Sequence, residues 1–143
     1  MFIGEYQHSV DDKGRVAVPA KFRADLATGA VVTKGLDACL VLYTKKDWEE
    51  LAGKVSQLPI SQRDARAFAR FTLGAAMEVE IDKQGRINLP NYLKEYAGIK
   101  KQAVIAGLYN RVEIWEDKKW EEYKQGAEKD SADIAEKLGD LGV

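Results

Sequence analysis

The hydrophobic positions of this chain predict one order of elements twice. Apolar and polar residues alternate at the period of a β-strand near 2–10, and a similar pattern returns over 76–81. A second short alternation follows in each half, at 15–18 and at 86–89. Short apolar runs then predict two more strands in each half, with a turn between them: 31–34 and 40–43 around the turn 36–38, and 103–106 and 112–115 around the turn 108–110.

Helix signals fall between these strands. A proline suits the first position of a helix and a glycine suits its end, which predicts helices over 20–26 (Pro19, Gly29) and 91–96 (Pro90, Gly98). Two further helices lie between the halves, separated by Pro59, and both fit a capping box, at Thr44–Asp47 and Ser61–Asp64. The C-terminal segment predicts an amphipathic helix weakened by Gly126, with its apolar residues three and four apart: Trp120, Tyr123, Ala127, Ile134, Leu138 and Leu141.

The two halves also share their residues. Val10–Pro19 aligns with Ile81–Pro90 at an offset of 71, from Asp11 to Asp82, and Asp, Gly, Arg and Pro coincide. The alignment continues at offsets of 73 and 72, for example from Trp48 to Trp120. These matches indicate an internal duplication. Because each copy alone has little core, the copies are expected to interlock into one β-rich α+β body with helices attached outside.

Charge is distributed unevenly along the chain, whose net charge is −1. Residues 116–143 hold nine acids and five lysines, a net charge of −4. Since the whole chain has 22 basic and 23 acidic residues, residues 1–115 hold 17 and 14, a net charge of +3. The negative charge of the tail therefore offsets the positive charge of residues 1–115. A positive charge there permits a nucleic-acid partner.

The Asp-x-x-Gly-Arg motif that both copies contain has two interpretations. Asp and Gly are ordinary turn residues, because the carboxylate accepts backbone N–H groups and glycine tolerates a positive φ. A turn does not require the arginine, however, and Arg15 recurs as Arg86, with lysines nearby at Lys13, Lys21 and Lys83. Arginine is well suited to bidentate contacts with phosphate and guanine. We therefore favour a DNA-binding pair of turns, built by Asp11, Gly14, Asp82 and Gly85.

The segments around the two motifs resemble a known family. VDDKGRVAVPAKFR and IDKQGRINLPNYLK are similar to the SpoVT/AbrB-type swapped-hairpin DNA-binding half-domain. Two such halves, opened by MFIGEY and joined through RFTLGAAMEVEID, resemble the MraZ family of bacterial transcriptional regulators over residues 1 to about 123. The resemblance implies an intramolecular pseudo-dimer: half-domains at 1–47 and 76–119, a helical connector at 48–75 and an acidic amphipathic tail at 120–143.

The same resemblance implies a function. Members of this family form rings of several subunits and bind short direct repeats in double-stranded DNA upstream of their own division and cell-wall operon. Arg15 and Arg86 would be the main DNA contacts, with Lys13, Lys83 and Lys21 beside them. We expect a cytoplasmic, nucleoid-associated protein.

Other functions fit the residues less well. We expect no enzyme, cofactor or metal, because Cys39 and His8 are the only residues of their types and no nucleophile motif is present. His8 is expected to be an exposed strand residue rather than a catalytic base. No apolar run approaches the ~18–20 residues of a membrane span, so no membrane partner is expected. An AbrB-like antitoxin or protein-binding module remains the alternative. The stripe of Arg63, Arg66 and Arg70 is either solvated, facing another subunit, or a further DNA contact.

Overall fold

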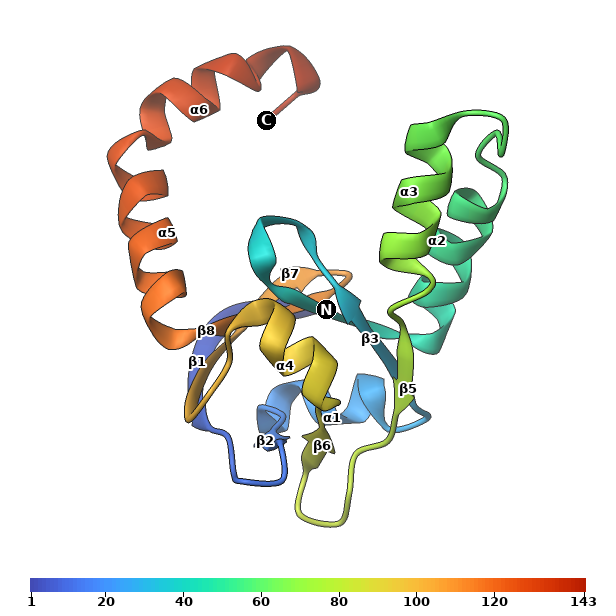
Figure 1. Ribbon diagram of the computed structural model, residues 1–143. Coiled ribbons are helices and arrows are strands. Elements are labelled where there is room, and N and C mark those ends of the chain that lie inside the picture. Colours follow the sequence, from blue (N-terminus) through green and yellow to red (C-terminus); the bar gives the residue numbers. More distant parts are fainter.

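Strands from both halves of the chain share one sheet. The computed structural model describes residues 1–143 and shows an α+β fold with a six-stranded antiparallel sheet (Figure 1). Its order is β1-β7-β8-β4-β3-β5, with β1 at Phe2–Ser9, β7 at Gln102–Tyr109, β8 at Val112–Glu116, β4 at Leu40–Thr44, β3 at Ala30–Lys34 and β5 at Met77–Val79. A separate two-stranded sheet pairs β2 (Arg15–Ala17) with β6 (Arg86–Asn88).

The pairings follow a pseudo-two-fold relation. In the small sheet Val16 lies opposite Ile87, which is its own counterpart in the other copy. In the large sheet Val41 of β4 lies opposite Glu113 of β8, again its counterpart. Moreover, β1 pairs with β7, and its counterpart β5 pairs with β3. The first strand of each half is therefore hydrogen-bonded to the other half, so the two copies interlock as expected.

Six helices and two short 3₁₀ turns surround this body. Helices α1 (Ala20–Leu26) and α4 (Asn91–Ala97) follow the two strands of the small sheet. Helices α2 (Lys45–Ser56) and α3 (Arg63–Thr72) form one projecting pair, and α5 (Asp117–Lys129) and α6 (Ser131–Lys137) form another; both pairs rise on the side away from the β1–β2 and β5–β6 turns (Figure 1). The 3₁₀ turns are η1 (Leu36–Ala38) and η2 (Gly139–Leu141).

Most of the predicted elements are present, and three details differ. Thr44 caps α2 by accepting the N–H of Asp47 at 3.1 Å, as predicted. Ser61 does not cap α3, because the N–H of Gln62 donates to the carbonyl of Pro59 and leaves Ser61 inside that turn. Helix α5 continues through Gly126 and ends at Lys129, and Asp130 separates it from α6. His8 was expected to be exposed, but it is half-buried, and its Nε2 has no hydrogen-bond partner.

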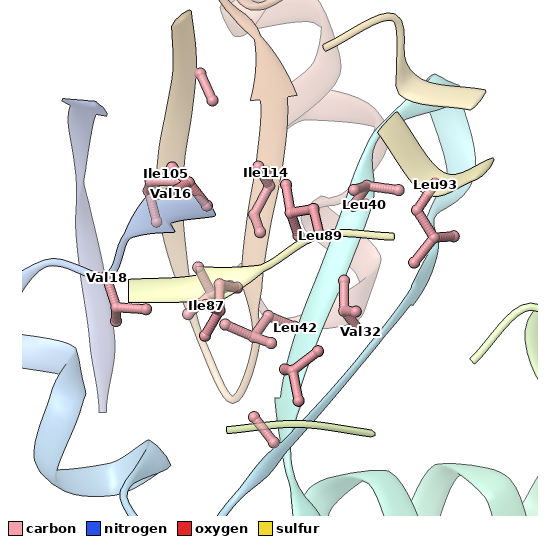
Figure 2. Close-up of a cluster of buried hydrophobic side chains, with 14 of the residues drawn as sticks. Val16, Val18, Val32, Leu40, Leu42, Ile87, Leu89, Leu93, Ile105 and Ile114 are labelled. Carbon is pink, nitrogen blue, oxygen red and sulfur yellow. The ribbon is translucent and has the colours of Figure 1, made fainter. Parts of the chain in front are cut away.

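The hydrophobic core lies between the small sheet and the large one. Figure 2 shows side chains of both copies meeting there, among them Val16, Val18, Ile87 and Leu89 beside β2 and β6. They pack against the large sheet and α4, with Val32, Leu40, Leu42, Leu93, Ile105 and Ile114. A second, smaller cluster contains Cys39, Val41 and Trp115. Trp120 of α5 packs against that cluster, with its ring 5.5 Å from that of Trp115, and so attaches the tail to the sheet.

Ile87 tests how far the two copies depend on one another. Its side chain is 1% exposed, at the centre of the β2–β6 pairing, so Ile87→Ala should lower the free energy of unfolding by about 2–5 kcal/mol. Urea denaturation followed by circular dichroism measures this loss. Ile60→Ala is the matched control, because Ile60 is 81% exposed and should change the stability by less than about 0.5 kcal/mol. Equal effects of both changes would contradict a core at this pairing.

Candidate functional site

The first Asp-x-x-Gly-Arg segment forms a closed turn between β1 and β2. The carboxylate oxygen Oδ1 of Asp11 accepts the backbone N–H of Lys13 at 3.0 Å and that of Arg15 at 2.9 Å. The backbone closes the same loop, because the N–H of Gly14 donates to the Asp11 carbonyl and the N–H of Asp11 donates to the Arg15 carbonyl, both at 3.0 Å. Gly14 has a φ of +82°, which a residue with a side chain rarely adopts.

The second segment repeats this geometry between β5 and β6. Oδ1 of Asp82 accepts the N–H of Gln84 and that of Arg86, both at 2.9 Å. The N–H of Gly85 donates to the Asp82 carbonyl at 2.9 Å, and Gly85 has a φ of +78°. The duplicated sequence therefore produces two turns of the same backbone shape.

Each turn orients its arginine. Arg15 donates Nε–H to Oδ2 of Asp11 at 2.7 Å, and Arg86 donates Nε–H to Oδ2 of Asp82 at 3.0 Å. The terminal amino groups of Arg15 form no hydrogen bond within the chain. Nη1 of Arg86 also lies 3.8 Å from Oδ2 of Asp11, which brings the two turns side by side at one end of the molecule (Figure 1).

The hydrogen bonds also determine the charge of the two carboxylates. The backbone N–H of Arg15 is the main cause that lowers the pKa of Asp11 from 3.8 to about 2, and the Arg15 side chain adds to it. The backbone N–H of Arg86 likewise holds the pKa of Asp82 below its ordinary value. Both groups are therefore ionised at neutral pH. Because the folded-state pKa of Asp11 is depressed, its stabilisation is present above about pH 3.8 and is lost as the pH falls towards 2.

Each turn is held in place by the other copy. The N–H of Val18 donates to the Gly85 carbonyl and the N–H of Leu89 donates to the Gly14 carbonyl, both at 2.8 Å. The two hydrogen bonds are equivalent, since Leu89 is the counterpart of Val18 and Gly85 is the counterpart of Gly14. The turns are consequently part of the interface between the halves.

Two basic residues of the helices also reach the turn of the other copy. Arg23 of α1 donates Nε–H to the Val18 carbonyl at 2.8 Å, and its guanidinium lies against Gly85 of the second turn. Lys94 of α4 lies against Gly14 of the first turn. Arg23 and Lys94 occupy equivalent positions of the two copies, 71 residues apart. That offset is the only signal for them in the sequence, and it does not show that each residue reaches the opposite turn.

The three lysines that the sequence predicts beside the arginines do not form one cluster. Lys13 and Lys83 are exposed at the tips of the two turns, and Lys21 is exposed on α1, outside the turns. None of their side chains forms an ion pair within the chain. The site is thus a cationic surface with two ordered guanidinium groups. The chain contains no cluster of three or more His, Cys, Asp or Glu residues that could hold a metal ion.

Comparison with known proteins defines the class to which this fold and site belong. Both halves match one family model, described as "MraZ protein, putative antitoxin-like", over residues 1–71 and 72–141. Three bacterial relatives named "Transcriptional regulator MraZ" align over all 143 residues and over the full length of each relative. They come from Natranaerobius thermophilus (51% identical), Acetivibrio thermocellus (50%) and Clostridium beijerinckii (52%).

The chain therefore belongs to a class of proteins that contain two repeats of one family model and whose relatives are named transcriptional regulators. Within that class it belongs to the MraZ family. None of its helices is long and apolar enough to cross a membrane.

The turn glycines give a direct test of the site's construction. A Cβ at Gly14 would lie 2.8 Å from the backbone carbonyl of Leu89, at a φ that already disfavours a side chain. Gly14→Ala should therefore lower the free energy of unfolding by at least about 1–2 kcal/mol. Gly53→Ala is the control, because nothing lies within 4 Å of that position inside α2.

In urea denaturation the control should leave the stability unchanged or raise it by about 0.5–1 kcal/mol. A Gly14→Ala variant as stable as the control would contradict the turn geometry.

Proposed function

We propose that this chain is a sequence-specific DNA-binding transcriptional regulator that contacts double-stranded DNA through its paired turns. The observation that carries the proposal is the pair of arginines, Arg15 and Arg86, each fixed through Nε by its own aspartate beside the other. A guanidinium held in this way loses little conformational entropy on binding and still presents donors to phosphate or to guanine. The aspartates thus orient the arginines and need not touch DNA.

The distribution of charge supports the same surface. The net charge of +3 belongs to residues 1–115, and the acidic tail begins at β8 and continues into helices that point away from the turns (Figure 1). The exposed Lys13 and Lys83 extend the cationic surface at the turn tips, and Lys21 lies on the following helix. In this proposal the lysines contact phosphates, which contributes affinity without sequence preference.

Arginine substitutions test the proposal. Arg15→Ala or Arg86→Ala should weaken DNA binding by about 1–3 kcal/mol, a loss of ~5- to 150-fold, because each removes one oriented guanidinium. Fluorescence anisotropy with a duplex of the chain's own upstream region measures the affinity, and circular dichroism checks the fold. Lys129→Ala is the control, since it removes the same charge from an exposed position of α5, a helix that points away from the turns. Full affinity of both turn variants would leave only a structural role for the turns.

The resemblance further supports an assembly and a target. We propose that copies of the chain form a ring and bind direct repeats upstream of their own division and cell-wall operon, at the nucleoid. The tail supports self-association, because Ile134, Leu138 and Leu141 of the last helical segments are 43%, 41% and 75% exposed, although they lie three and four residues apart. The pairing of the first strand of each half with the other half, β1 with β7 and β5 with β3, supports two swapped-hairpin halves.

A ring makes a prediction about the number of DNA repeats. One pair of turns makes few phosphate contacts, whereas linked modules gain avidity of ~10²–10⁴-fold. A duplex with several repeats should therefore bind far more tightly than a duplex with one, and removal of residues 131–143 should reduce that difference. A mobility-shift titration with duplexes of equal length provides the measurement. Equal affinity for one repeat and for several would contradict cooperative binding by a ring.

The alternative is a protein-binding, antitoxin-like role, which the family's description favours. The stripe of Arg63, Arg66 and Arg70 on α3, in which Arg63 and Arg70 are exposed and Arg66 is half-buried, offers a surface for it. Two fused halves argue against it, since an antitoxin needs only one half-domain and a neutralising tail. The DNA titration separates the two roles, because a chain that only neutralises a toxin would not depend on Arg15. We propose no catalytic function.

A further inference from the structure

The two turns share a backbone but differ in charge at their tips. Asp12 occupies the position of Lys83, and Lys13 occupies that of Gln84. Formal charges over residues 11–15 sum to zero, whereas those over residues 82–86 sum to +1. Asp12 and Lys83 are both exposed, and neither forms an ion pair within the chain. Nothing in the fold itself uses either side chain.

The electrostatic interaction with DNA is of opposite sign for these two side chains. Its phosphates attract the ammonium group of Lys83 and repel the carboxylate of Asp12. A carboxylate can face DNA favourably only where a base edge offers it a donor, such as the amino group of cytosine. Lys83 at the tip of the second turn therefore suits a phosphate, whereas the equivalent Asp12 in the first turn suits a base edge or solvent.

The arginines show a second inequality. Nη1 of Arg86 lies 3.8 Å from Oδ2 of Asp11, but Arg15 forms no such contact with Asp82. Arg86 consequently faces two carboxylates and Arg15 faces one. The side chain of Arg86 is also the less exposed of the two, at 28% against 35%. The two guanidinium groups are thus unequally available to a partner.

From these observations we propose that Asp12 and Lys83 are specificity-determining residues, which make the two turns contact unequal halves of a DNA site. The inference rests on the proposed DNA binding and adds to it an orientation for each chain on the duplex. A pseudo-symmetric body with unequal turns recognises a site that is not palindromic. Successive chains with the same orientation would then need sites repeated head to tail.

The chain's own sequence supplies the test. The double change Asp12→Lys with Lys13→Gln gives the first turn the residues of the second, Asp-Lys-Gln-Gly-Arg. The full-length wild type and this variant are each used to select bound duplexes from a pool with a randomised central segment. The wild type should enrich a motif without two-fold symmetry, and the variant should enrich one whose two halves are related by two-fold symmetry.

The salt dependence gives a second readout on a mixed-sequence duplex. For this measurement Asp12→Lys is made alone, so that Lys13 stays in place and one phosphate contact is added. The slope of log affinity against log salt should steepen by about 0.9, so this variant should lose ~3- to 4-fold more affinity between 50 and 200 mM salt. The reciprocal change, Lys83→Asp, should make the slope shallower by a similar amount. Thermal unfolding checks that both variants fold, as expected for exposed tip residues that occur naturally in the same type of turn.

A charge-matched control separates local from general effects. In the tail, Asp140→Lys with Lys137→Gln matches the net charge of the double change, and Asp140→Lys alone matches that of Asp12→Lys. Both tail variants should leave the motif and the slope as in the wild type. A turn variant that still selects the wild-type motif, or a tail variant that shifts the slope equally, would overturn the inference while leaving DNA binding intact. If the wild-type chain does not bind DNA at all, the proposed function fails, and the inference fails with it.

Discussion

The pairing of β2 with β6 is the interaction on which the rest of this structure depends. Each copy of the repeat contributes only three residues to that sheet, too few for a stable unit. Val16 and Ile87 meet at its centre and are buried between the small and large sheets. The reciprocal bonds from Val18 to Gly85 and from Leu89 to Gly14 then fix each turn to the opposite copy. The same pairing therefore forms the core and fixes the position of the turns.

The same constraint explains how the proposed site is divided among residue types. The backbone N–H groups of each turn need acceptors, and the aspartate supplies one oxygen for them. Its other oxygen is then free to hold the Nε of the arginine. A single carboxylate thus closes the turn and orients the cation. The aspartate therefore has a structural role, and the terminal amino groups of Arg15 remain available to a partner.

Local parts of this fold could be predicted from the sequence, and non-local parts could not. Helix α1 lies at the predicted residues 20–26, because proline, glycine and apolar spacing act over a few residues. The duplication also implied two similar turns. No local pattern showed that β1 pairs with β7, that β5 pairs with β3, or that Arg23 reaches Gly85. These contacts join residues far apart in the chain, so propensity and periodicity carry no information about them.

Fusion of two halves in one chain permits what two identical chains could not achieve. In a dimer of identical half-domains both turns carry the same residues, and any change appears twice. Here the residues that build the turn backbone coincide between the copies, while the tips differ as Asp12 and Lys83. The differences thus fall where the backbone geometry makes no demand on the side chain. Pseudo-symmetry preserves the shared core, and the covalent link leaves the two turns free to contact different chemical groups.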